Sequence, residues 1–108
     1  MKIILKGAAA SPGKIKGKVR VIKKQVETNI EIEKGEIIVI SFVTPFVFNY
    51  IFKAGAIITD HGGITSHAAN IARELGIPCI VGTEKATQIL KDGTEVIVDG
   101  DNGIVYKE

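Results

Sequence analysis

The residues with the most evident chemistry lie in the hexapeptide GGITSH, at 62–67. Its two glycines, Gly62 and Gly63, allow the chain to turn sharply at low steric cost. The residues that follow have helical periodicity, so His67 falls in the first turn of a helix, where several backbone N–H groups lack intrahelical partners. A histidine in that position has three uses open to it: it can carry a covalent group, bind a metal ion or cap the helix.

Two properties of the position favour covalent phosphoryl chemistry at His67. The positive end of the helix dipole disfavours a positive charge on the ring, which keeps the ring nucleophilic. Unpaired N–H groups, with the hydroxyls of Thr65 and Ser66, can hold a phosphoryl group placed on the ring, and one hydroxyl can cap the helix. On spacing alone a capping or packing role is the commoner one. Helical phase nevertheless places His67 with Asn70 and Glu74 on the polar side, so we expect its side chain to be accessible.

The neighbouring ionisable residues give a weaker indication. A metal site built from Asp60, His61 and His67 lacks the His-x-x-x-His or Cys-x-x-Cys spacing typical of such sites, so no metal ligand is predicted. Asp60 ends an apolar run and can either orient a ring or cap the turn, whereas His61 is expected to be a surface loop residue. The single cysteine, Cys79, lies in an apolar strand and is expected in the core.

The elements that must position these residues alternate between strands and helices. Apolar runs predict strands at residues 2–5, 18–24, 36–43, 56–59 and from 79, with a loop at 7–13. Helices are predicted at 45–53 and 66–75, a helical turn at 84–90 and a closing hairpin at 95–106. This order favours an α/β fold with a partly parallel central sheet, short helices and a C-terminal β-hairpin.

Composition limits the class of protein. The 108 residues are 45% hydrophobic and 24% charged, which predicts one globular domain spanning 1–108. The net charge of +2 permits anionic ligands, and nucleic acid is an unlikely partner. The alternating cations Lys14, Lys16, Lys18 and Arg20 are expected to form a solvated strand face. No apolar run approaches the roughly 20 residues of a membrane span, and the single cysteine suits a reducing, cytoplasmic location.

Aromatic residues are concentrated in one segment. All four phenylalanines and Tyr50 fall within residues 42–52. The helix predicted at 45–53 is apolar nearly all round, and such a helix needs burial on more than one side. We therefore expect the region of Phe46, Tyr50 and Phe52 to form a homo-oligomer contact or to dock a constitutive partner.

Beyond these patterns, GGITSHAANIARELGIPCIVG at 62–82 resembles the signature of the mobile phosphohistidine domain of phosphoenolpyruvate-utilising enzymes. That family includes phosphoenolpyruvate synthase and pyruvate phosphate dikinase. SPG at 11–13, the Thr44-Pro45 step and KDGTEVIVDGDNGIVY at 91–106 are similar to further family segments, so the resemblance covers nearly the whole chain. It implies a swivelling β/β/α domain that carries a phosphoryl group between two active sites.

The resemblance also implies site residues and partners. The residue that takes the phosphoryl group is His67, framed by Gly62, Gly63, Thr65 and Ser66. Asp60, Asn70 and Arg73 are expected to support the site. Complete enzymes of the family add a nucleotide-binding domain and a pyruvate- or phosphoenolpyruvate-binding barrel, with magnesium at both. Neither fits in 108 residues, so this chain is expected to be a fragment, a subunit or a stand-alone relative that binds no cofactor itself.

Two positions depart from the family pattern. Asn70 stands where an aliphatic residue is usual, and from one turn after His67 it can hydrogen-bond the ring or a phosphoryl group. Phe46 stands where an acidic residue is common. These departures keep a second function open, in which a non-catalytic module of the same fold binds a partner through the helix at 45–53.

Overall fold

The computed structural model describes residues 1–23 and 30–108. Within them, the helical elements are the 3-10 helices η1 (Pro45–Asn49) and η2 (Ile51–Lys53) and the α-helices α1 (His67–Leu75) and α2 (Ala86–Ile89). The strands are β1 (Lys2–Lys6), β2 (Ala8–Ser11), β3 (Lys14–Ile22), β4 (Ile37–Ile40), β5 (Ala56–Thr59), β6 (Cys79–Val81), β7 (Glu95–Asp99) and β8 (Ile104–Lys107).

The described strands form one mixed sheet in the order β1-β8-β7-β3-β4-β5-β6-β2. Strands β3, β4, β5 and β6 run parallel to one another, whereas β1, β8, β7 and β2 join by antiparallel pairing. Strand β3 belongs to both parts, because its first half pairs with β7 and its second half with β4. The predicted partly parallel sheet and C-terminal hairpin are therefore confirmed.

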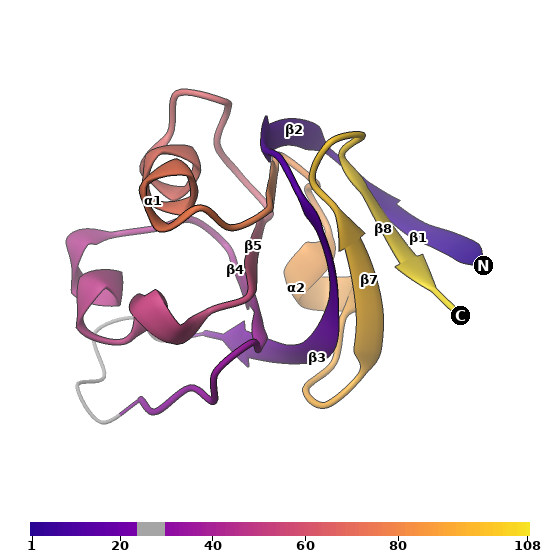
Figure 1. The fold of residues 1–108 in the computed structure, drawn as a ribbon, viewed down its shortest axis with the longest axis horizontal. Helices are drawn as coiled ribbons and strands as arrows, with labels where there is room; N and C mark the ends of the chain where they lie inside the picture. The colour runs from indigo at the N-terminus through magenta and orange to yellow at the C-terminus, as the bar shows by residue number, and fades with distance from the viewer. Residues whose placement is uncertain (24–29) are drawn as a thin grey trace.

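The sheet folds into two layers, and the helices add a third (Figure 1). One core cluster joins the parallel strands to α1 and the 3-10 segment, and the other joins their opposite face to β1, β7, β8 and α2. Strand β4 illustrates the arrangement, since Ile38 and Ile40 enter the first cluster and Ile37 and Val39 the second. A strand covered on both faces is a continuous apolar run, as the sequence of β4 is. The layers give the expected β/β/α architecture.

Three predicted elements differ from the structure. The loop expected at 7–13 contains β2, which pairs with β6 from Ala8↔Val81 to Ser11↔Cys79. Its AAAS sequence has little intrinsic strand preference, so the pairing partner determines its conformation. The helix expected at 45–53 is instead two short 3-10 helices, and Thr44 precedes the first without a side-chain cap hydrogen bond. The strand expected at 18–24 is β3, which begins earlier, at Lys14, and ends at Ile22, and residue 24 lies outside the described residues.

The alternating cations of β3 contact other parts of this chain. Lys16 pairs with Glu95 and Glu108, and Arg20 pairs with Glu36. The Lys14 ammonium lies 5.8 Å from the centre of the Tyr106 ring. These contacts agree with a solvated strand face. In the described part of the chain no helix is long and apolar enough to cross a membrane.

Candidate functional site

Helix α1 begins at the predicted histidine. The Ser66 hydroxyl accepts a hydrogen bond from the Ala69 amide at 3.5 Å, so of the two capping candidates Ser66 is the N-cap. His67 is the first helical residue, and its side chain is exposed, as expected from helical phase. Gly76 ends the helix in the left-handed conformation (φ 70°), and its amide donates to Arg73. The histidine therefore stands at the positive end of a short, well-capped helix.

The loop before the helix places its two glycines in different environments. Gly62 has φ +107°, a conformation that favours glycine, and a Cβ there would lie 3.2 Å from the Ser66 side chain. Gly63 lacks a positive φ, and a Cβ there would meet nothing within 4 Å. The Gly63 carbonyl accepts from the Ser66 amide at 3.0 Å, which closes the turn into the helix. Open space thus lies beside Gly63, next to the helix start.

Arg73 holds this loop in place. Its Nη2 donates to the Ile64 carbonyl at 2.6 Å, and its Nε donates to the Ala10 carbonyl of β2 at 2.9 Å. Its Nη1 donates to Asn70 Oδ1 at 3.3 Å. The guanidinium therefore links the glycine loop, helix α1 and the edge strand β2. The two carbonyls that it contacts carry no side-chain signal, so sequence reasoning did not identify Ala10 or Ile64 as part of the site.

Asn70 uses its carbonyl oxygen for this contact. An arginine guanidinium can only donate hydrogen bonds, so the Asn70 side-chain oxygen faces Arg73 and the amide nitrogen is turned elsewhere. Asn70 is exposed and lies one turn after His67 on α1. Its NH₂ group is thus a hydrogen-bond donor on the helix face that carries the histidine.

Asp60 is directed to another element. It is buried, and its two carboxylate oxygens accept from the Thr87 amide at 2.9 Å and from the Thr87 hydroxyl. These bonds join the end of β5 to α2. The carboxylate is thus a structural tie, a role that differs from the two considered for Asp60 in the sequence, which were to orient a ring or to cap the turn. Thr87 was not identified from the sequence, because nothing in its neighbourhood marks it as the partner of a residue 27 positions away.

The remaining candidates lie around the same edge of the sheet. His61 is exposed, as expected, and its amide donates to the Ser41 carbonyl at 2.9 Å, while its carbonyl accepts from the Thr59 hydroxyl at 2.7 Å. Thr65 is exposed in the loop before α1. Among the described residues no group of three or more histidine, cysteine or carboxylate side chains is placed to hold a metal ion.

The aromatic segment divides between core and surface. Tyr50 is only 4% exposed and packs in the α1-side core, so it is not part of a surface patch as predicted. The four phenylalanines, by contrast, are all at least half exposed: Phe42, Phe46, Phe48 and Phe52. The backbone bond from His61 to Ser41 brings the start of this segment beside the loop that leads to α1.

Comparison with known proteins adds independent information. Residues 32–103 match the family model described as "PEP-utilising enzyme, mobile domain". The chain is 51% identical over 106 residues to a probable phosphoenolpyruvate synthase of Archaeoglobus fulgidus, covering 98% of this chain and 14% of that protein. It is 49% identical to phosphoenolpyruvate synthase of Pyrococcus furiosus, covering 98% of this chain and 13% of that protein. The chain therefore spans about a seventh of these relatives.

Solved structures share the fold. A solution structure of Enzyme I matches with a TM-score of 0.61 and 38% identity, over 68% of this chain and 31% of that one. Aconitase X of Thermococcus kodakaraensis matches with a TM-score of 0.70 and 27% identity, over 94% of this chain and 95% of that one. The same architecture thus occurs in proteins with different names and contexts, so the function must be argued from the site.

Proposed function

We propose that this chain is a phosphoryl carrier with His67 as the carrying residue. The premise is that the chain belongs to the mobile-domain family of PEP-utilising enzymes. The observation that supports the proposal most directly is the position of the ring. His67 is exposed at the first position of α1, directly after a glycine loop with open space beside Gly63. A phosphoryl group needs both an accessible nitrogen and room for its oxygens.

The proposed chemistry is two reversible transfers. A ring nitrogen of His67 attacks the phosphorus of a donor, and an N–P bond forms as the P–O bond to the leaving group breaks. The leaving oxygen keeps the electron pair of that bond. In delivery, an acceptor oxygen attacks the same phosphorus, and the N–P bond breaks with its electron pair returning to the ring. By family membership, the donors and acceptors are ATP and the phosphoenolpyruvate–pyruvate pair.

The residues around the ring have distinct roles in this proposal. The first-turn N–H groups of α1 and the Thr65 hydroxyl hold the phosphoryl oxygens, as helix N-termini commonly do for anions. Ser66 is occupied as the helix cap, so it acts by fixing the first turn. Asn70 supplies a further donor, and Arg73 and Asp60 keep the loop and the strand end in place.

The carrier requires partners for the two half-reactions. We propose a nucleotide-binding partner and a pyruvate- or phosphoenolpyruvate-binding partner, each with its own magnesium, in the cytoplasm, where the free Cys79 thiol would stay reduced. The exposed phenylalanines would serve as docking or self-association surface around Phe46 and Phe52. Because the sites for both half-reactions would lie in these partners, the chain alone would accept or lose one phosphoryl group but would not catalyse repeated turnover.

The test is labelling of the purified chain with radiolabelled phosphoenolpyruvate and, separately, with ATP labelled on its phosphoryl groups. Each reaction is run with and without extract of the source cells. We expect label that is lost in acid and retained in base, the behaviour of a phosphohistidine. His67→Ala should carry no label, and His61→Ala, which removes the other exposed histidine, should be labelled like the wild type.

Two results would contradict the proposal. One is the same label on His67→Ala as on the wild type, which would place the phosphoryl group elsewhere. The other is absence of label on a folded wild-type chain with both donors and extract present. The second result would favour the non-catalytic binding module of the same fold.

A further inference from the structure

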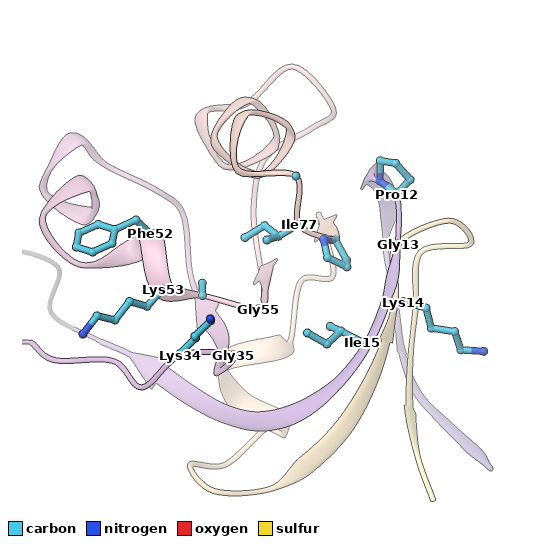
Figure 2. A pocket seen from close by; sticks show the side chains of 13 residues that line it. Pro12, Gly13, Lys14, Ile15, Lys34, Gly35, Phe52, Lys53, Gly55 and Ile77 are labelled. Atoms are coloured by element: carbon cyan, nitrogen blue, oxygen red, sulfur yellow. The ribbon is translucent and has the colours of Figure 1, made fainter.

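A groove of about 520 Å³ lies at the opposite end of α1 from His67. Its lining comes from four segments: the start of β3, the turn at 34–35, the end of η2 with the residues up to Gly55, and residues 76–78 after α1. In Figure 2, Ile15 and Ile77 point into the space that these segments enclose. A volume of this size lies within the range of roughly 300–1,000 Å³ typical of small-molecule sites.

The groove combines an apolar floor with charge of one sign. Ile15, Ile77 and Pro78 are among its apolar lining residues, and every charged lining residue is a lysine. The Lys34 ammonium points toward the groove in Figure 2, whereas Lys14 and Lys53 point outward at its margins. No aspartate or glutamate lines this groove in the described structure. A carboxylate is nevertheless held against the lining, since Asp101 Oδ1 accepts from the Gly13 amide at 3.2 Å. The three lysines outnumber this carboxylate, so the electrostatic field favours an anion.

Two of the last four carbonyls of α1 are paired, which weakens but does not remove the negative end of the helix dipole beside the groove. The Ala72 carbonyl accepts from the Ile77 amide at 3.0 Å, and the Arg73 carbonyl accepts from the Gly76 amide at 3.2 Å. Such paired carbonyls expose less negative charge than a frayed helix end would. Gly35 and Gly76 leave open space where a side chain would stand, so a flat molecule can approach the backbone there, whereas the Cβ positions of Gly13 and Gly55 are filled by Pro78 and the Gly35 carbonyl.

We propose that this groove binds a small organic anion with an apolar, planar body. The body lies against Ile15 and Ile77, and the acidic group pairs with the Lys34 ammonium. The site is separate from the phosphoryl site, because the nine residues of α1 place Gly76 roughly 13 Å from His67 along the helix. A ligand there contacts the segment that ends the helix whose first residue is the proposed carrier.

The experiment uses anilinonaphthalene sulfonate, an aromatic sulfonate, as the probe with the whole 108-residue chain. Binding is followed by fluorescence titration and by amide chemical shifts in a ¹⁵N-labelled sample. We expect saturable one-to-one binding, weakened by added salt, with the largest shift changes at the amides of Gly13, Gly35, Gly55 and Gly76. Glycine amides resonate in a distinct spectral region, and assignment of the twelve glycines of the chain makes this readout local.

Matched variants separate this groove from other surfaces. Lys34→Glu and Ile77→Ala should each weaken probe binding about fivefold or more, the loss expected when one favourable contact is removed. Lys85→Glu and Ile89→Ala change an exposed lysine and an exposed isoleucine outside the groove, and should change binding less than about twofold. His67→Ala should bind the probe as the wild type does, because His67 does not line the groove.

The proposal is overturned by either of two patterns. Shift changes centred on the exposed Phe42–Phe48 surface would place the probe on the aromatic segment. Equal affinity of wild type and Lys34→Glu would remove the electrostatic basis of the site. Thermal unfolding of each variant shows whether a loss of binding comes with a loss of folded structure.

Discussion

At the scale of single residues, the adjacent glycines Gly62 and Gly63 make different demands on a side chain. Gly62→Ala should destabilise the fold by about 1–2 kcal/mol, because alanine must adopt a positive φ and its Cβ would approach Ser66. Gly63→Ala should leave stability within about 0.5 kcal/mol, since its Cβ would meet nothing. It should nevertheless slow phosphoryl acceptance, because the methyl group reduces the open space in the loop before α1, where the phosphoryl group is proposed to be held. Urea unfolding and labelling rates measure the two effects.

The glycine prediction is wrong if Gly63→Ala unfolds as readily as Gly62→Ala. It is also wrong in its functional part if Gly63→Ala accepts label at the wild-type rate. The contrast between the two variants matters more than either value, because the residues differ by one position in the same loop.

Asn70 is the site residue at which the sequence is expected to depart from the family pattern. Asn70→Leu should shorten the lifetime of the phosphohistidine roughly two- to tenfold, the range that corresponds to one lost hydrogen bond. The reason is that the side-chain oxygen is held by Arg73, which leaves the NH₂ group to donate to a phosphoryl group on His67. Stability should change little because the side chain is exposed. The measurement is the half-life of the label at neutral pH. An unchanged half-life would show that Asn70 hydrogen-bonds Arg73 and does not contact the phosphoryl group.

Residue-scale features were predictable where they follow local rules. The cap, the left-handed Gly76 and the exposed phase of His67 all depend on neighbours within four positions, which the sequence displays. The contacts of Arg73 were not predictable, because their acceptors are the backbone carbonyls of Ala10 and Ile64 and every residue has such a carbonyl. Only the three-dimensional path of β2 brings the first of them near.

At the scale of elements, the aromatic segment divides between core and surface. Tyr50 stands between η1 and η2, in neither helix, and is buried together with Val47 of η1 and Ile51 of η2. Phe46, Phe48 and Phe52 occupy other positions of the two short helices and are exposed. The apolar composition predicted a helix that needs burial, but composition does not distinguish 3-10 from α-helical turns.

Burial of Tyr50 leads to a stability prediction. Its hydroxyl is buried and has no hydrogen-bond partner in the described structure, and burial raises the pKa of the phenol. An unpaired buried hydroxyl costs about 1–3 kcal/mol, so Tyr50→Phe should be neutral or stabilising by up to about 1 kcal/mol. Phe48→Tyr, which adds a hydroxyl at an exposed site, is the control and should have little effect. A clear loss of stability in Tyr50→Phe by urea unfolding would show that the hydroxyl has a partner.

Arg73 connects three elements, so its removal should affect all of them. Arg73→Gln should reduce the free energy of unfolding by about 1–2 kcal/mol, because charged hydrogen bonds to two backbone carbonyls are lost. Glu74→Gln, at the next exposed position, should change it by less than about 0.5 kcal/mol. Hydrogen exchange should also rise in β2 and in the glycine loop of Arg73→Gln. Equal exchange in the two variants would mean that packing alone holds the loop.

At the scale of the whole molecule, the order of layers depends on pairings between distant segments. Continuous apolar runs such as β4 predicted strands buried on both faces, and the structure confirms this. The position of β2 at one edge of the sheet was not predictable, because Ala8–Ser11 gains strand structure only by pairing with β6, some 70 residues later. Likewise β1 pairs with β8, so the described ends of the chain lie side by side (Figure 1).

The burial of the central sheet can be tested through the reactivity of the Cys79 thiol. Cys79 is fully buried at the start of β6, and burial raises the pKa of its thiol to about 12. Since the thiolate is the reactive form, native protein at pH 8 should react with iodoacetamide only as fast as it opens. Labelling should therefore follow global unfolding, and Ala54→Gly or another core-loosening change should accelerate it in proportion to lost stability. Rapid labelling of fully folded protein would contradict this burial.

The raised pKa of the same thiol should lower the free energy of unfolding at alkaline pH. The ordinary thiol value is 9.0 and the folded value is raised, so the unfolded state loses its proton first as the pH rises. The contribution of Cys79 to stability is therefore complete below pH 9 and declines between pH 9 and the folded pKa. Cys79→Ala removes this titration but leaves a small cavity, so it should be less stable than wild type at pH 7. The difference in free energy of unfolding between wild type and Cys79→Ala should narrow from pH 9 to pH 11 in urea unfolding. A constant difference would show that the thiol has the same pKa in the folded and unfolded states.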